Sequence, residues 1–220
     1  MDATPEGLES VLAEDLAWRK IELSVLSKSL ESAANRNSDS PESRALSRAT
    51  VTLAYAHWEG YTKNALDAYC HFLSRRRLRL AELNDSLLTA QAIRLLKRRA
   101  SGDESVDKVL TELLRGNSTE RLTLPRTEMS DTRSNLRHER LQELLGGLGL
   151  AFDRFVLVQN LIDVRLCDRR NSVAHGKSDF PDARDTLDLK NEAVQLMEDV
   201  RELLISASSE KTYYAERVLS

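Results

Sequence analysis

Apolar residues form a repeating stripe along the first part of the chain. Over residues 6–35 they recur at steps of three and four positions, which is the spacing of one helical face. The stripe consists of Leu8, Val11, Leu12, Leu16, Leu23, Leu26 and Leu30. A polar stretch that closes with Pro41 interrupts the pattern and favours a turn. The pattern therefore predicts a long N-terminal helix.

A second long helix is predicted over residues 42–77, and its apolar residues cover more than one side. One stripe consists of Val51, Tyr55, Trp58, Thr62 and Tyr69, and another of Leu46, Leu53, Gly60 and Ala68. A helix that is apolar on several sides is usually central, so we expect most of these residues in the core. The small residues Ala49, Ala56 and Gly60 leave room for the close approach of another helix.

The middle of the chain, residues 80–135, has a less regular pattern. Short helices are predicted over 87–99 and 106–114, followed by a loop over 116–125. This irregular insert is where we expect substrate-specific features.

Regular helical patterns return after the insert. The predicted helices span residues 136–145, 158–174 and 183–208. For the first of these, Ser134 or Asn135 is the expected cap, and Gly146 and Gly147 are the expected stop. The last helix is expected to continue into the tail at 213–216.

The composition supports helices throughout. The chain of 220 residues has only 8 Gly and 4 Pro, the residues that disfavour helices most. Hydrophobic residues make up 41% and charged residues 30%, as in ordinary globular proteins. We therefore predict an all-α fold in a single domain.

Several features predict a cytoplasmic protein without a membrane partner. The first residues are acidic and lack the apolar core of a secretory signal. No stretch approaches the roughly 20 apolar residues that cross a bilayer. Cys70 and Cys167 lie in predicted helices without Cys-x-x-Cys spacing, which favours packing residues in a reducing compartment.

Charge and histidine spacing limit the possible chemistry. The net charge of −3 argues against a general nucleic-acid coat but permits a local basic patch. Basic clusters at 75–79 and 97–99 are interpreted mainly as solvated helix ends, with RNA contact as the alternative. The histidines at 57, 71, 138 and 175 have no second His or Cys at ligand spacing, so we expect no metal and no other cofactor.

The clearest candidate for chemistry is a charged run that ends at Gly176. Asn171 and His175 are four residues apart and share one face of a continuing helix, where the amide can orient the imidazole. Arg170 is five residues from His175, about 140° around an ideal helix, so a two-fold dimer would gather these groups better than one chain. The structural alternative is that Gly176 ends a helix whose negative end Arg169 and Arg170 complement. Spacing alone leaves both interpretations open.

The apolar residues just before this run also have two possible roles. They are Leu161, Ile162, Leu166 and Val173. On a helix they either fill the core or form a dimer contact, and both interpretations remain open.

Two segments resemble HEPN domains. The sequence Arg-Asn-Ser-Val-Ala-His-Gly at 170–176 resembles their Arg-polar-x3-His motif. The sequence Ala-Tyr-Ala-His-Trp-Glu-Gly-Tyr-x-Lys at 54–63 is similar to the signature helix of a bacterial stand-alone HEPN nuclease family, and segment 135–150 fits that family's spacing. The short motif is weakly specific, but its combination with the signature helix is strong.

The resemblance implies a HEPN-type bundle of four to five core helices that is usually dimeric and cleaves RNA without a metal. Within a single domain over 1–220, the core would lie at about 44–205. The N-terminal helix lies within 1–35, and the insert at 80–135 would be a variable addition.

The resemblance also assigns Arg170, Asn171 and His175 to catalysis. Imidazole transfers protons near neutral pH, as the attack of a ribose 2′-OH on the adjacent phosphate requires. Guanidinium stabilises the charge that builds on the phosphate oxygens. Asn171 would position His175 or the phosphate, and the products would be a 2′,3′-cyclic phosphate and a 5′-hydroxyl.

Glu59 and Lys63 are supporting candidates because they fall in the signature helix. They form an i, i+4 pair, so the alternative to lining the active cleft is a helix-stabilising ion pair of about 0.2–0.5 kcal/mol. Some HEPN toxins carry Tyr two positions after the motif His, where a partner nucleotidyltransferase modifies it. Here that position is Lys177, so we expect a different means of silencing.

The leading functional hypothesis is an endoribonuclease that acts in toxin–antitoxin or anti-phage defence as a homodimer. Its partners would be the RNA substrate and an antitoxin or another protein of the defence system. The alternative is a non-catalytic dimeric HEPN interaction module in such a complex. A plain helical adaptor is a third hypothesis, in which the motif is an accident.

Overall fold

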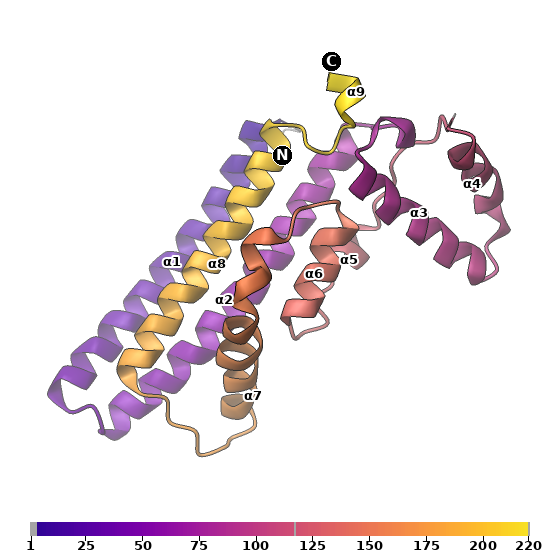
Figure 1. Cartoon of the computed structure of the whole chain (residues 1–220). Coiled ribbons are helices and arrows are strands. Elements are labelled where there is room, and N and C mark those ends of the chain that lie inside the picture. The colour runs from indigo at the N-terminus through magenta and orange to yellow at the C-terminus, as the bar shows by residue number, and fades with distance from the viewer. Residues whose placement is uncertain (1–3, 117, 220) are drawn as a thin grey trace.

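Three long helices form the body of the protein. A computed structural model describes residues 4–116 and 118–219, and its helical architecture confirms the predicted all-α fold. Helices α1 (Pro5–Arg36), α2 (Pro41–Arg75) and α8 (Ala183–Ser209) run side by side (Figure 1). Thr4 caps α1 and Ser40 caps α2, and each cap is followed by a proline in the first turn, where proline is favourable.

The shorter elements gather around the two ends of α2. In Figure 1, α3 and α4 project as an arm from one end, and α7 lies beside the other half of α2. The short α-helices are α3 (Asp85–Ala100), α4 (Asp107–Leu114), α5 (Arg126–Met129), α6 (His138–Gly147), α7 (Arg169–Ala174) and α9 (Glu216–Leu219). The 3-10 helices are η1 (Leu80–Glu82), η2 (Glu104–Val106) and η3 (Asp153–Val158), and a π-helix, η4, spans Leu161–Asp168.

Helix α2 is the central helix, as its two apolar stripes predict. Its largest buried side chains are Tyr55, Trp58, Tyr61, Tyr69 and Phe72, and they pack in one continuous core with leucines of α1 and α8. The small residues Ala49 and Ala56, in contrast, remain exposed along a shallow groove that also includes Leu53 and Val173. The third small residue, Gly60, does receive a close neighbour.

That neighbour is the guanidinium of Arg19, a buried side chain of α1. A Cβ atom at position 60 would lie 2.9 Å from Arg19 Nη1, so glycine lets this guanidinium approach α2 without being displaced. Arg19 Nη1 also lies 3.3 Å from Nδ1 of the buried His57, and its other nitrogen pairs with Asp15 at 3.1 Å. Because guanidinium only donates, His57 Nδ1 accepts and the ring proton sits on Nε2, 2.8 Å from Glu22. Two residues of the signature helix, His57 and Gly60, thus hold α1 against α2.

The structure corrects three predicted helix boundaries in the second half of the chain. Helix α6 begins at His138 rather than at 136, and neither Ser134 nor Asn135 caps it. Gly146 and Gly147 belong to its last turn, and the chain turns at Gly149, which has φ of +67°. The predicted helix at 158–174 is divided among a 3-10 segment, the π-helix and α7, because apolar periodicity does not distinguish these helix types.

The tail also differs from its prediction. Helix α8 ends at Ser209, and the chain reverses so that Tyr213 is buried against the core. The backbone oxygen of Tyr213 accepts from the Asn84 N–H at 3.0 Å, and Ala215 N donates to Glu82 at 2.9 Å. These contacts dock the tail at the start of the arm, so the tail does not continue α8.

The two Gly residues near the end of α6 provide a matched stability test. We predict that Gly149→Ala lowers the free energy of unfolding by about 2 kcal/mol or more, because φ is positive there and a Cβ would lie 2.7 Å from Leu87 N. Gly146→Ala should be neutral or stabilising by up to about 1 kcal/mol, since it is helical and its Cβ meets open space. Urea denaturation measures both, and equal effects would contradict this prediction.

Candidate active site

The motif residues lie at the end of α7. Arg170 and Asn171 are inside the helix, and His175 is the residue just beyond it, with an exposed side chain. Gly176 has φ of +69°, and the N–H groups of Gly176 and Lys177 donate back to Val173 and Ser172, both at 3.1 Å. This is a glycine-terminated helix end, as the structural alternative from the sequence predicts for Gly176. It also turns His175 out of the helix.

Arg170 packs inward against α2. Its guanidinium carbon lies 4.0 Å from the centre of the Tyr55 ring, and Nη2 donates to the backbone oxygen of Ser134 at 3.1 Å. The Tyr55 hydroxyl accepts from Leu136 N at 2.8 Å, and burial raises the pKa of this phenol well above its usual value. Arg170 Nε is buried without a hydrogen-bond partner in the described chain. The contact with Tyr55 joins the signature helix to the Arg-His motif.

Glu59 and Lys63, the two supporting candidates, are placed differently. Glu59 follows Tyr55 by one turn, is half-buried, and its charge contributes to raising the pKa of the Tyr55 phenol after burial and Cys167. Its Oε1 is buried, and like Asn135 Oδ1 it has no hydrogen-bond partner in the described chain. Lys63 is exposed, and among residues 4–116 and 118–219 no ion pair joins it to Glu59. Glu59 thus lies on the Arg170 side of α2.

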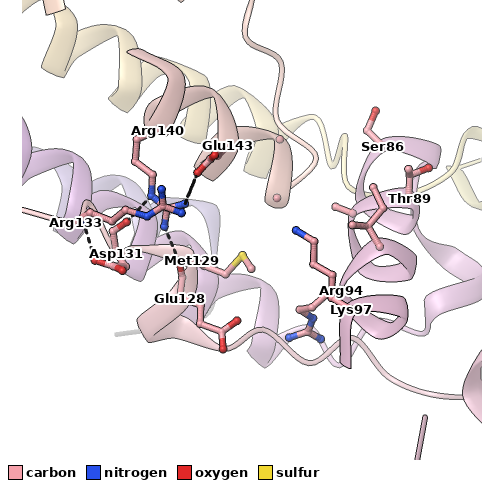
Figure 2. Close-up of a pocket in the computed structure, with 14 residues that line it drawn as sticks. Ser86, Thr89, Arg94, Lys97, Glu128, Met129, Asp131, Arg133, Arg140 and Glu143 are labelled. Carbon is pink, nitrogen blue, oxygen red and sulfur yellow. Dashed lines mark hydrogen bonds and ion pairs between the residues drawn. The ribbon is translucent and has the colours of Figure 1, made fainter. Parts of the chain in front are cut away.

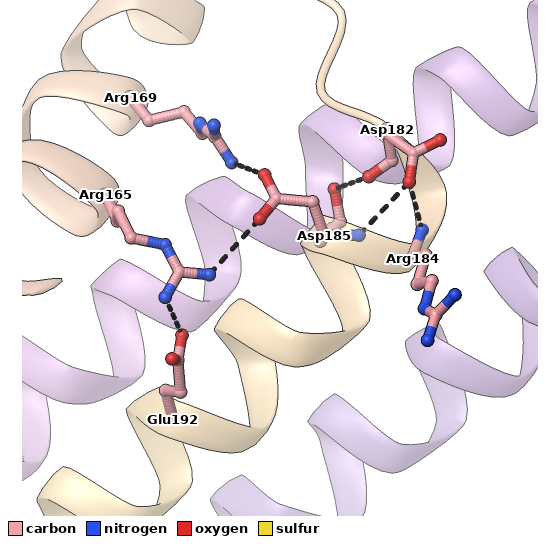
Figure 3. Close-up of polar contacts among 7 residues, drawn as sticks. Arg165, Arg169, Asp182, Arg184, Asp185 and Glu192 are labelled. Atoms are coloured by element: carbon pink, nitrogen blue, oxygen red, sulfur yellow. Dashed lines mark hydrogen bonds and ion pairs between the residues drawn. The ribbon is translucent and has the colours of Figure 1, made fainter.

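Acidic residues of α8 hold the π-helix and α7 in place (Figure 3). Arg165 pairs with Asp185 at 3.2 Å and also with Glu192, and Arg169 pairs with the second oxygen of Asp185. Asp182 caps α8 by accepting from the N–H of Asp185 at 3.2 Å, which fixes that residue. The hydrogen bond from Arg169 holds the pKa of the Asp185 carboxyl below its usual range.

Arg48 of α2 fixes the chain that follows the motif. Its Nη1 donates to the backbone oxygens of Lys177 and Asp179, both at 2.7 Å, and its Nη2 donates to that of Val173 at 3.3 Å. Its guanidinium also lies 5.4 Å from the Phe180 ring centre. Sequence reasoning missed Arg48, because a contact between side chain and backbone across 125 to 131 positions leaves no periodic signal.

Asn171 and His175 differ from the arginines around them. Within the described residues, neither side chain makes a hydrogen bond or an ion pair. The imidazole is exposed at a fixed helix end, and the amide is half-buried one turn before it. An exposed imidazole near an amide can exchange protons and bind a polar ligand near neutral pH.

The apolar residues before the motif are now assigned. Ile162 and Leu166 are fully buried, so these two belong to the core. Leu161 is partly buried against the same core, and Val173 is half-buried in the groove beside α2. The apolar side chains that this segment exposes are Val156, Leu157 and Val164. In the described residues no group of three or more His, Cys, Asp or Glu is arranged to hold a metal ion, and no helix is long and apolar enough to cross a membrane.

We predict that Arg48→Ala loosens the segment that carries His175. Amides at 174–180 should exchange hydrogen faster, and the free energy of unfolding should fall by about 1–2 kcal/mol as three carbonyls lose their charged donor. Arg44→Ala is the control, because Arg44 shares the contact with Phe180 but forms its ion pair with Asp39. Equal exchange rates in the two variants would show that the hydrogen bonds do not fix the segment.

Asp185 should make stability depend on pH. Because its pKa is lowered in the folded state, its contribution is present above the ordinary value of 3.8 and is lost as pH falls through the folded pKa. The difference in unfolding free energy between wild type and Asp185→Asn should therefore shrink below about pH 4. Asp188→Asn, at an exposed position of the same helix, is the matched control. A constant difference for Asp185→Asn would refute the ion-pair account.

One family model matches most of the chain. The RiboL-PSP-HEPN family matches residues 14–206, from within α1 to near the end of α8. No curated protein and no solved structure matches the chain. The matched range confirms the predicted HEPN relationship, and it spans the positions of the signature helix, the irregular insert and the Arg-His motif. The chain belongs to the RiboL-PSP-HEPN family.

Proposed function

We propose that this protein is a metal-independent endoribonuclease with His175, Arg170 and Asn171 as its catalytic residues. The observation that carries the proposal is the exposed His175 imidazole, which has no hydrogen-bond or ion-pair partner among the described residues and lies at the end of a helix that is fixed from several sides. Membership of a HEPN family supports a function connected with RNA. Cys70 and Cys167 are both buried and form no disulfide with each other, which fits action in a reducing cytoplasm.

The proposed reaction is attack of a ribose 2′-OH on the adjacent phosphate. His175 would accept the 2′-OH proton or protonate the 5′-oxygen that leaves, and a second imidazole from a partner subunit would perform the other transfer. Arg170 would stabilise the phosphate oxygens, since only one guanidinium nitrogen is bonded to Ser134 and the charge is permanent. Asn171 would hold the phosphate or the imidazole. The products would be a 2′,3′-cyclic phosphate and a 5′-hydroxyl.

A dimer would complete this site. Arg170 faces α2 while His175 is exposed beyond the helix, so one chain presents them in different directions. Exposed Leu157 and Val164 on the same segment offer an apolar contact for a second copy. A two-fold axis near α7 would then place both motifs around one groove.

The second candidate is a non-catalytic dimeric HEPN interaction module. The observation that favours it is the structural engagement of Arg170 with Tyr55 and Ser134, which gives this residue a role without catalysis. Either function suits toxin–antitoxin or anti-phage defence with an antitoxin or another protein as partner. The exposed residue two positions after His175 is Lys177 and not a tyrosine, so a partner would silence the protein by a means other than tyrosine modification.

The test of catalysis is substitution of the motif. We predict that His175→Ala and Arg170→Ala each lower RNA cleavage at least about a hundredfold, because an acid/base group or an electrostatic stabiliser is lost. Far-UV circular dichroism should show unchanged helix content. His71→Ala, at a half-buried position of α2, is the control and should retain activity. Equal activity of wild type and His175→Ala would leave the interaction module as the better account.

The dimeric site has its own test. Arg170→Ala and His175→Ala chains, each inactive alone, should regain part of the cleavage when they are mixed, because a heterodimer contains one intact Arg170 opposite one intact His175. Water would then make the proton transfer for which the second imidazole is missing. The measurement is initial cleavage rate against mixing ratio, with sedimentation to establish the oligomeric state. A mixture no more active than its components, or an active monomer, would contradict the shared site.

A further inference from the structure

A cleft separates the arm from the body of the protein. It has a volume of about 730 Å³ and lies between α3 on one side and α5, α6 and the intervening chain on the other. Figure 2 shows Arg94 and Lys97 extending from α3 toward this space, with Met129 facing them from the opposite side. The size is that of a small-molecule site and is larger than a single phosphate ion needs.

The positive charges around the cleft are unequally engaged. Arg140 donates to Glu143 at 2.6 Å and to the backbone oxygen of Asp131 at 2.8 Å, and Arg133 lies 3.4 Å from the same glutamate. The side chain of Lys97, in contrast, makes neither a hydrogen bond nor an ion pair among the residues that the structure describes. The cleft therefore has an ammonium group without a hydrogen-bonded partner in the described chain, beside a glutamate that Arg140 and Arg133 already neutralise.

Arg94 adds a second cation to the same wall. One of its terminal nitrogens donates to the backbone oxygen of Thr123, and its Nε is buried with no hydrogen-bond partner in the described chain. Burial lowers the pKa of this guanidinium, so its charge is poorly solvated. Arg94 and Lys97 are three positions apart on α3 and face the cleft together, which suits two oxygens of one phosphate.

The rest of the lining suits the other parts of a nucleotide. Ile93, of which 49% is exposed, and Met129 offer apolar surfaces for a base. Gly146 also lines the cleft, and an added Cβ there would meet nothing within 4 Å. Hydroxyls of Ser86 and Thr89 line the α3 side, where they can bind ribose oxygens. The carboxylate of Glu128 can accept from an exocyclic amine of the base.

We propose that this cleft binds a nucleotide, with its phosphate on Lys97 and Arg94 and its base against Ile93 and Met129. The nucleotide is either free in solution or part of a bound RNA chain, and only the second source rests on the proposed ribonuclease function. The cleft is close to the motif along the backbone, because Arg133 lines it and the next residue, Ser134, accepts from Arg170. Arg133 and Ser134 both have positive φ, 55° and 56°, a conformation typical of strained functional turns.

Two variants test the site by different means. Lys97→Glu reverses the charge of the Lys97 side chain. Gly146→Leu places a bulky side chain in the cleft, at a helical position where an added Cβ meets nothing within 4 Å. Lys108→Glu is the matched control, since it makes the same charge change on an exposed α4 residue outside the cleft lining. The probes are AMP, GMP, CMP and UMP by calorimetry, and a short fluorescent 2′-O-methyl oligonucleotide, which lacks the attacking hydroxyl.

We expect a mononucleotide to bind wild type and His175→Ala equally, because His175 is outside the cleft lining. Any probe that binds wild type should bind Lys97→Glu and Gly146→Leu at least about tenfold more weakly. The Lys108→Glu control should bind as wild type. Mononucleotide binding identifies a free nucleotide as the ligand, while binding of the oligonucleotide alone identifies a nucleotide of the RNA chain. The proposal is overturned if no probe binds, or if both cleft variants bind as tightly as wild type. These measurements report binding and not cleavage, so failure of the proposed ribonuclease activity can be distinguished from failure of the nucleotide site.

Discussion

The contact between the Arg170 guanidinium and the Tyr55 ring connects the two sequence motifs of this protein. Tyr55 belongs to the most buried helix of the bundle, and its hydroxyl is fixed by the backbone N–H of Leu136. A cation over an aromatic ring contributes about 0.5–2 kcal/mol, depending on its exposure to solvent. The same guanidinium donates to Ser134, so three segments distant in sequence meet at one side chain. The position of α7, and hence of His175, depends on this junction.

Other charged contacts complete the support of the motif. Arg165 and Arg169 hold the π-helix and α7 to α8, Arg137 pairs with Asp168 at 2.5 Å, and Arg48 holds the following loop. π-helical turns are uncommon and often occur at functional sites. In this segment the arginine side chains are engaged in structure, while the side chains of Asn171 and His175 make no hydrogen bond or ion pair within residues 4–116 and 118–219. This contrast is what separates the candidate catalytic groups from their support.

Periodicity predicted the elements that bury a continuous apolar face. The helices at 6–35, 42–77 and 183–208 match α1, α2 and α8 within a few residues. A long run of apolar residues at helical spacing is a strong signal for an amphipathic helix. The division of 158–174 into three helix types could not be predicted, since all of them repeat at similar steps. The reversal of the tail depends on hydrogen bonds to Asn84 and Glu82, which are distant in sequence.

Some residues of the candidate site could likewise be predicted from local sequence, and others could not. Local spacing located Arg170, Asn171 and His175, and the signature helix located Glu59, but nothing local predicts that Tyr55 would stack on Arg170. The residues of the signature helix have two different structural roles. His57 and Gly60 accommodate the buried Arg19, whereas Tyr55 and Glu59 face the motif side of α2. Arg48 and the acidic residues of α8 follow only from the tertiary fold.

The proposed function is cleavage of RNA by internal attack of the 2′-OH. The most direct measurement incubates the purified protein with total RNA in excess chelator and determines the chemistry of the new ends by ligation-based sequencing. The account predicts 5′-hydroxyl and 2′,3′-cyclic phosphate ends, formed at the same rate with and without the chelator. Intact RNA, or 5′-phosphate ends that appear only when a divalent metal is added, would contradict it.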